Sequence, residues 1–208
     1  MTITLENIGK RFMYDWIFRN VNCTFENGSF AILGHNGSGK STLLKVISGH
    51  LTPSKGKITF IDTNQKIISE DIIYKYISYA APYIELVEEF TLDEQLQFHK
   101  NFKPFFPDLT LEGIKDILKL SNTQDKQIKF YSSGMKQRLK LVLACCSDTS
   151  VLLLDEPTTN LDKQGVSWYQ HLVSQYSRDR LVIIASNVED DYFLCKQQIL
   201  MTDYKRGN

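Results

Sequence analysis

A glycine-rich segment in the first quarter of the chain could hold phosphate groups. Residues 34–42 have the sequence GHNGSGKST, which fits the pattern G-x-x-x-x-G-K-[ST]. Glycines let backbone N–H groups point inward at a phosphate without interference from Cβ atoms. Lys40 would place a cation on the β- and γ-phosphate oxygens, and the Ser41 hydroxyl would be a ligand for Mg²⁺. The residues expected to hold the nucleotide here are Gly34, Asn36, Gly37, Ser38, Gly39, Lys40, Ser41 and Thr42.

Two carboxylates follow an apolar run in the second half of the chain. Residues 151–154 are continuously apolar and predict a buried strand, after which come Asp155 and Glu156. In an open α/β sheet, ligands bind beyond the carboxyl ends of the strands. We therefore expect Asp155 to hold Mg²⁺ and Glu156 to act as the general base that polarises an attacking water.

Elements that would position these groups follow from the hydrophobic pattern. Strands are predicted at 3–8, 16–25, 30–33, 57–61, 77–82, 151–154 and 181–185, and helices at 40–48, 110–120, 132–146 and 162–177. The pattern from 84 to 120 is helical, with interruptions at Pro104 and Pro107. Continuous apolar strands that alternate with helices predict an α/β fold with a mostly parallel sheet covered on both faces. A small antiparallel N-terminal sheet and a helical insertion at 84–147 would complete a single domain, 1–208.

Composition argues against several other classes of protein. The 208 residues are 42% hydrophobic and 23% charged, which is typical of a soluble globular protein. The 24 basic and 24 acidic residues cancel, which argues against a nucleic-acid binder held by phosphate neutralisation. No apolar run approaches the roughly 20 residues that cross a bilayer, and no secretory signal is visible, so we expect a cytoplasmic location. The four cysteines lack metal-ligand spacing and are expected to be reduced thiols.

Further segments resemble the ATP-binding cassette (ABC) family. Residues 131–138, YSSGMKQR, are similar to the family signature, usually written LSGGQ, and residues 155–162, DEPTTNLD, are similar to its Walker B glutamate and D-loop. With 34–42, these motifs span essentially the whole chain. The resemblance implies a P-loop NTPase fold with a RecA-like sheet, ATP and Mg²⁺ as cofactors, and Ser41 and Asp155 at the metal. It also implies that adenine stacks on Phe12, with Tyr14 and Trp16 as alternatives.

The same resemblance implies partners. Two cassettes would pack head to tail as a homodimer, so that ATP held by one chain meets Ser132 and Gly134 of the other, and hydrolysis would weaken this contact. A separate integral membrane permease would hold the pair at the inner face of the cell membrane, and no nucleic acid is expected. Residues 134–138 resemble ABC-2 type exporters, and the C-terminus is short for an importer-style regulatory domain, so export is favoured. The alternatives are a nucleotide-dependent interaction module with little turnover and a soluble, non-transport ABC ATPase.

Three places depart from the family pattern. Pro82 stands where the family has a glutamine, Ser186-Asn187 stands where it has Thr-His, and the signature carries Ser133 and Met135. Asn187 can hydrogen-bond a γ-phosphate but cannot carry a positive charge. Lys40, Glu156 and Asn187 are therefore the predicted catalytic residues. We expect hydrolysis to be slower than in relatives that have Gln and His, unless Asn187 substitutes fully.

The segment after Pro82 has two further predicted roles. An oxygen from Glu85, Glu88 or Glu89 could stand in for the missing glutamine, although each is equally typical of an exposed loop carboxylate. In the family, the groove beside the glutamine receives a helix of the membrane subunit. The docking residues predicted by position are Tyr83, Leu86, Val87 and Phe90.

Overall fold

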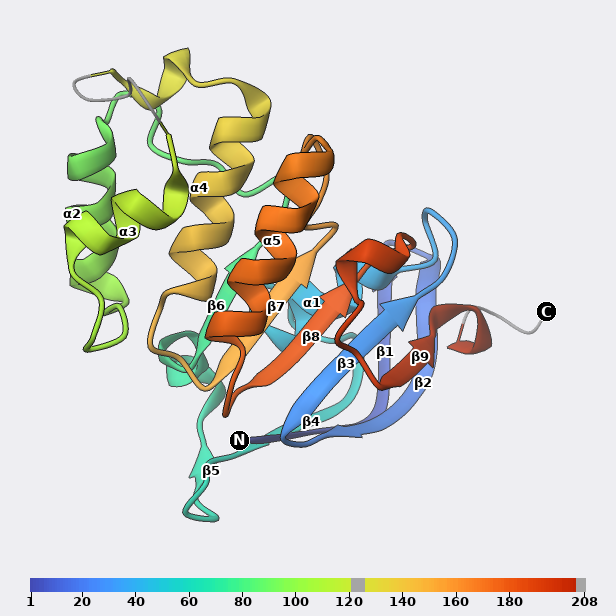
Figure 1. Ribbon diagram of the computed structural model, residues 1–208. Helices are drawn as coiled ribbons and strands as arrows, with labels where there is room; N and C mark the ends of the chain where they lie inside the picture. The colour runs from blue at the N-terminus through green and yellow to red at the C-terminus, as the bar shows by residue number, and fades with distance from the viewer. Residues whose placement is uncertain (121–125, 205–208) are drawn as a thin grey trace.

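The computed structural model describes residues 1–120 and 126–204. Two β-sheets are packed against one another, and helices cover the outer face of the larger sheet (Figure 1). Residues 121–125 of the predicted helical insertion and 205–208 of the predicted domain lie outside the described residues.

The larger sheet has five parallel strands. Its order is β6 (Ile77–Ala80), β7 (Val151–Asp155), β8 (Leu181–Ala185), β3 (Gly28–Leu33) and β9 (Gln197–Leu200). All residues of β7 and β8 are buried, because alternate side chains enter two different cores. Leu153 and Ile183 join the core on one face, whereas Leu152 and Leu154 join the core on the other.

A four-stranded antiparallel sheet covers one face of the parallel sheet. Its order is β2 (Asp15–Phe25), β1 (Thr2–Phe12), β4 (Lys55–Ile61) and β5 (Ile67–Ile68). Helix α1 (Lys40–Ile47) contributes Leu43, Leu44 and Ile47 to the core between the two sheets. The phosphate loop, residues 34–39, therefore joins a buried strand to a buried helix.

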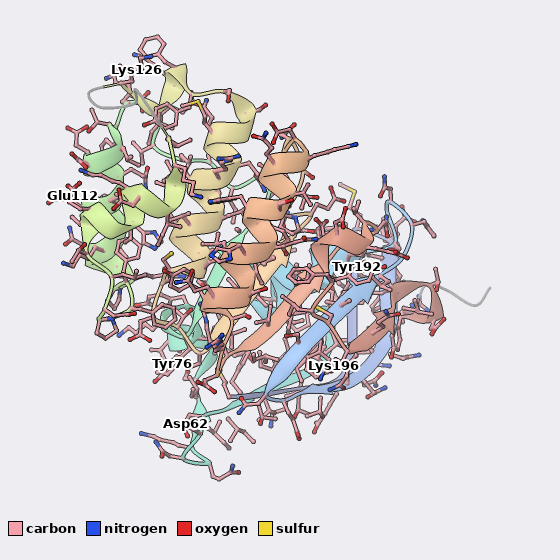
Figure 2. The ribbon with its side chains drawn as sticks, in the orientation of Figure 1. Asp62, Tyr76, Glu112, Lys126, Tyr192 and Lys196 are labelled. Carbon is pink, nitrogen blue, oxygen red and sulfur yellow. The ribbon has the colours of Figure 1, made fainter. Side chains whose placement is uncertain are left out.

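Helices α4 (Ser133–Cys145) and α5 (Lys163–Tyr176) pack on the other face of the parallel sheet, as Figure 1 shows, and α2 (Leu92–Phe102) and α3 (Leu111–Leu118) lie beyond α4. Each has a side chain that caps its N-terminus, and these caps are Thr91, Thr110, Ser132 and Asp162. Short 3₁₀ helices occur at Glu70–Lys75, Ile128–Phe130, Glu189–Asp191 and Met201–Tyr204. Figure 2 shows Glu112 and Lys126 at this helical end and Asp62 at the opposite end.

The predicted fold class is confirmed, and every predicted strand and helix is present. The prediction of helix from residue 84 is wrong, because residues 84–91 are not helical and α2 begins only at Leu92. Strands β5 and β9 were not predicted, because the first has two residues and the second is mostly exposed. Within the described residues, no helix is long and apolar enough to cross a membrane. Cys23, Cys145, Cys146 and Cys195 are all free thiols.

Candidate functional site

The phosphate loop forms a hollow of about 180 Å³ at the carboxyl end of β3. Gly34, Gly37 and Gly39 all have positive φ angles, which L-residues with side chains rarely adopt. The hollow is lined by Asn36, Gly37, Gly39, Lys40, Ser41, Thr42 and Glu156. The loop therefore brings the predicted lysine, hydroxyl and glutamate together around one space.

Lys40 is the buried cation of this hollow, with 5% of its surface exposed. Its Nζ donates to the carbonyl oxygen of Gly34 at 2.7 Å and approaches that of His35 at 3.5 Å. Burial lowers the pKa of Lys40, and the charges of Glu156 and Asp155 oppose that shift. An anion that entered the hollow would give this ammonium a stronger partner than two neutral carbonyls.

Gly39 has no room for a side chain, which leads to a first testable expectation. A Cβ there would lie 2.8 Å from Ile17 Cγ2 and 2.9 Å from Phe18 Cδ1. In addition, the φ angle of +103° is one that residues with a side chain rarely adopt. Gly39→Ala should therefore destabilise the free protein by about 2–4 kcal/mol, through backbone strain and overpacking. For a chain of this size, thermal denaturation should show a midpoint roughly 5–12 °C lower.

Gly37→Ala is the matched control for this substitution. Gly37 also has a positive φ, +75°, but a Cβ there would meet no atom within 4 Å. Gly37→Ala should therefore lower the free energy of unfolding by only about 1–2 kcal/mol, the cost of placing an alanine in left-handed backbone. If the two variants lowered the thermal midpoint equally, this would contradict the close packing of Gly39 against β2.

Asp155 and Glu156 lie at the carboxyl end of β7, as the sequence predicts. Glu156 has a φ of +43°, and its N–H donates to the carbonyl of Ala185 at 2.8 Å, so the chain turns sharply and presents the side chain to the hollow. Asp155 is 1% exposed, and burial raises its pKa, an effect that the hydroxyls of Ser41 and Tyr83 oppose. Its Oδ1 is buried without a hydrogen-bond partner. A divalent cation beside Ser41 would satisfy this oxygen, so Ser41 and Asp155 fit the predicted Mg²⁺ site.

Asn187, the third predicted catalytic residue, follows β8 and is exposed at the edge of the phosphate loop. Its Nδ2 donates to Oδ1 of Asn36 at 3.1 Å. The preceding Ser186 donates to Oδ2 of Asp191, whose Oδ1 accepts the N–H of Thr158 at 3.2 Å. The loop that carries Asn187 is therefore connected both to the phosphate loop and to the segment after Glu156.

The signature residues form a second hollow, of about 370 Å³. Ser132 caps α4, its Oγ accepting the N–H of Met135 at 3.2 Å, and a Cβ on Gly134 would lie 3.0 Å from the carbonyl oxygen of Asn160. This hollow is lined by Leu120, Ser132, Ser133, Gly134, Met135, Arg138, Asn160, Leu161 and Asp162. Among the described residues, it has no lining residue in common with the phosphate hollow. One chain therefore keeps its predicted phosphate and signature residues at separate sites.

The N-terminal aromatic residues differ in how much ring they leave exposed. Phe12 ends β1 with 48% of its surface exposed, and Lys10 Nζ lies 5.3 Å from its ring. Tyr14 lies in the turn between β1 and β2 and is 89% exposed. The guanidinium groups of Arg11 and Arg19 lie 5.7 and 4.4 Å from the centre of the Trp16 ring. Phe12 and Tyr14 expose more of their rings than Trp16, which is half-buried, so they are the better candidates for base stacking.

Several residues at the site have roles that the sequence analysis did not predict. Tyr83 was predicted only as a docking residue, yet its hydroxyl donates to Asp155 Oδ2 at 2.9 Å. Gln137, buried in α4, donates to the carbonyl of Pro157 at 2.8 Å and ties the signature helix to the segment after Glu156. Asp191 joins two loops as described above. No local sequence signal marks these roles, because each partner lies far along the chain or on another element.

Comparisons with known proteins indicate one family for this chain. A family model described as "ABC transporter" matches residues 18–159. The chain is 32% identical over 192 residues to the cytochrome c biogenesis ATP-binding export protein CcmA of Reclinomonas americana, an alignment that covers 90% of this chain and 85% of that protein. It is 33% identical over 173 residues to mouse ATP-binding cassette sub-family A member 17, covering 81% of this chain but spanning only 10% of that relative's length.

Solved structures show the same fold. An ATP-binding cassette solved as a dimer, in a post-hydrolysis state bound to ADP and Pi, superposes with a TM-score of 0.81 at 20% identity, covering 99% of this chain and 100% of that one. At this level of identity, the likeness shows the fold alone. Among the residues that the structure describes, no group of three or more His, Cys, Asp or Glu side chains could by itself hold a metal.

Proposed function

Because the chain belongs to the ATP-binding cassette transporter family, we propose that it is an ATP-hydrolysing subunit that dimerises around ATP and powers a separate membrane permease. The observation that carries this proposal is the separation of the two hollows on one chain. The two hollows share no described lining residue, and we infer that Ser132 and Gly134 reach a nucleotide in the phosphate hollow from a second chain. Phosphate charge between Lys40 of one subunit and the α4 N-terminus of the other would then hold the dimer together.

The proposed chemistry assigns one task to each residue. Ser41 and Asp155 hold Mg²⁺, which when bound neutralises charge on the phosphates. Lys40 neutralises the β- and γ-phosphate oxygens, and Glu156 accepts a proton from the attacking water. Asn187 donates a hydrogen bond to the γ-phosphate from its amide, and Phe12 stacks on the base. Since Asn187 brings no positive charge, we propose that turnover is slower than in relatives with histidine at this place.

A mixing experiment tests the shared site. Lys40→Met and Gly134→Asp should each abolish most ATP hydrolysis when present in both subunits. In a hybrid dimer of the two variants, one of the two sites combines an intact phosphate loop with an intact signature. With random pairing, half the dimers are hybrids with one active site of two, so phosphate release should recover to about a quarter of the wild-type rate.

The control replaces Lys40→Met by a chain that carries both substitutions. Every site formed with Gly134→Asp then contains a defective signature or a defective loop, so no activity should return. If hybrid dimers form with ATP but no activity returns in the first mixture, the site is not shared between two chains.

The proposed permease contact lies beside Pro82. Two adjoining hollows, of about 630 and 340 Å³, share the lining residues Ile84, Glu85, Leu86 and Lys140, and the second extends along α2. Leu86 lines both, Val87 lines the first, and Phe98 and Phe102 of α2 expose apolar rings at the second. Phe90, in contrast, packs on Phe98 and on the helical core, so we propose that it holds the groove in shape from below and does not contact the permease itself. Co-purification with an integral membrane protein from solubilised membranes would support this part of the proposal.

Export is the direction we propose. The relative from Reclinomonas americana is named as an export protein, and residues 134–138 resemble ABC-2 type exporters. The alternative of an interaction module with little turnover is favoured by Pro82 and Asn187. The position of Glu156 in the phosphate hollow favours hydrolysis instead.

A further inference from the structure

Two tyrosines occupy the side of the metal site where Pro82 leaves no polar side chain. Tyr83 donates its hydroxyl to Oδ2 of Asp155 at 2.9 Å, and the hydroxyl of Tyr79 lies 3.5 Å from the same oxygen. The two hydroxyls are also hydrogen-bonded to each other. Oδ2 of Asp155 therefore has protein donors, whereas the buried Oδ1 has none.

The backbone around the pair is held so that both rings point at Asp155. Tyr79 lies on β6 opposite Leu153 of β7, two residues before Asp155. The carbonyl of Pro82 accepts a hydrogen bond from Lys140 Nζ of α4 at 2.7 Å, which fixes the chain just before Tyr83. From the other side, Lys45 Nζ of α1 lies 3.9 Å from the centre of the Tyr83 ring.

The acidic residues of the same segment lie along the outer groove. Glu88 forms an ion pair with Lys136 of α4, and the charge of Glu85 acts on Lys140. Both line the outer groove, and neither Glu85, Glu88 nor Glu89 lines the phosphate hollow.

We propose that Tyr83, supported by Tyr79, is the positioning residue that takes over the place of the missing glutamine: it holds Asp155 through Oδ2 and leaves Oδ1 to the Mg²⁺ of bound Mg-ATP. This inference rests on the proposed nucleotide site. Mutation of a residue that orients a metal ligand through hydrogen bonds typically lowers metal affinity 10- to 100-fold. The Tyr83 hydroxyl should therefore affect nucleotide binding only when the metal is present.

Tyr83→Phe removes this hydroxyl but keeps the ring and its contact with Lys45. The test measures the Kd of a methylanthraniloyl derivative of ATP by fluorescence, with MgCl₂ and with EDTA, in a Glu156→Gln background where the nucleotide stays intact. The factor by which Mg²⁺ tightens binding should fall about 10-fold. The Kd in EDTA should stay unchanged, whereas a general loss of structure would weaken both.

Two further variants complete the design. Tyr74→Phe removes a hydroxyl from an exposed tyrosine outside the site and should leave both Kd values unchanged. Adding Pro82→Gln to Tyr83→Phe should restore most of the Mg²⁺ effect by returning a side-chain amide. An unchanged Mg²⁺ effect in Tyr83→Phe, equal weakening with and without Mg²⁺, or no recovery in the double variant would each overturn the assignment. Failure of the unaltered protein to bind the nucleotide would count against the proposed function instead.

Discussion

Glu156→Gln is expected to slow ATP hydrolysis about 10²- to 10⁴-fold, the usual contribution of a positioned general base. Glutamine keeps the size of the side chain and the hydrogen-bonding capacity of one oxygen, but it cannot accept a proton from water at neutral pH. Glu156 lies in the phosphate hollow and its backbone is fixed by a hydrogen bond to Ala185, so the substitution should change the chemistry without moving the loop. Single-turnover phosphate release measures this effect directly.

The same variant should also separate hydrolysis from assembly. If phosphate charge holds two chains together, an intact triphosphate that persists should keep them together, and ATP with Mg²⁺ should shift the variant to a dimer in size-exclusion chromatography. ADP should leave it monomeric. Glu26→Gln, an exposed carboxylate in the turn between β2 and β3, is the control and should match the wild type in both assays. If Glu156→Gln released phosphate at the wild-type rate, Glu156 would not be the general base.

The phosphate loop could be predicted from sequence because its chemistry is contiguous in the chain. Its glycines, Lys40 and Ser41 all fall within the eight successive positions 34–41, and the strand before and the helix after them have clear apolar patterns. The caps of α4 and α5 are local in the same sense, since Ser132 and Asp162 bond N–H groups three residues onward. The start of α2 carried such a signal too, because Thr91 and Glu94 form a capping box, and it would have corrected the helical prediction for 84–91.

The role of Tyr83 could not be predicted in this way. It lies 72 residues from Asp155 along the chain, and the two meet only because β6 pairs with β7 in the parallel sheet. A missing glutamine suggested a missing contact, and the acidic residues nearby were the natural substitutes by charge. The structure instead pairs Glu88 with Lys136 of α4 and turns the Tyr83 hydroxyl toward Asp155. Which side chain faces the site depends on the path of the backbone after Pro82, and no residue type specifies that path.

Lys40→Met is expected to weaken ATP binding about 30- to 150-fold, which corresponds to the roughly 2–3 kcal/mol of a charge-assisted hydrogen bond to phosphate. Methionine retains much of the length and the apolar stem of lysine, so the loss reflects the ammonium. Fluorescence titration with the methylanthraniloyl derivative of ATP measures the Kd, and Lys57→Met, on the exposed surface of β4, controls for removal of a positive charge.

The stability of the free Lys40→Met protein should respond differently from its affinity. In the free protein the ammonium is buried among neutral carbonyls, and burial lowers its pKa, which means that the cation is unfavourably placed before nucleotide binds. Removing it should leave the thermal midpoint unchanged or higher, while the affinity for nucleotide falls. Such opposite responses are expected of a group held in place for a ligand. A lower midpoint together with an unchanged Kd would mean that Lys40 stabilises the loop and does not bind phosphate.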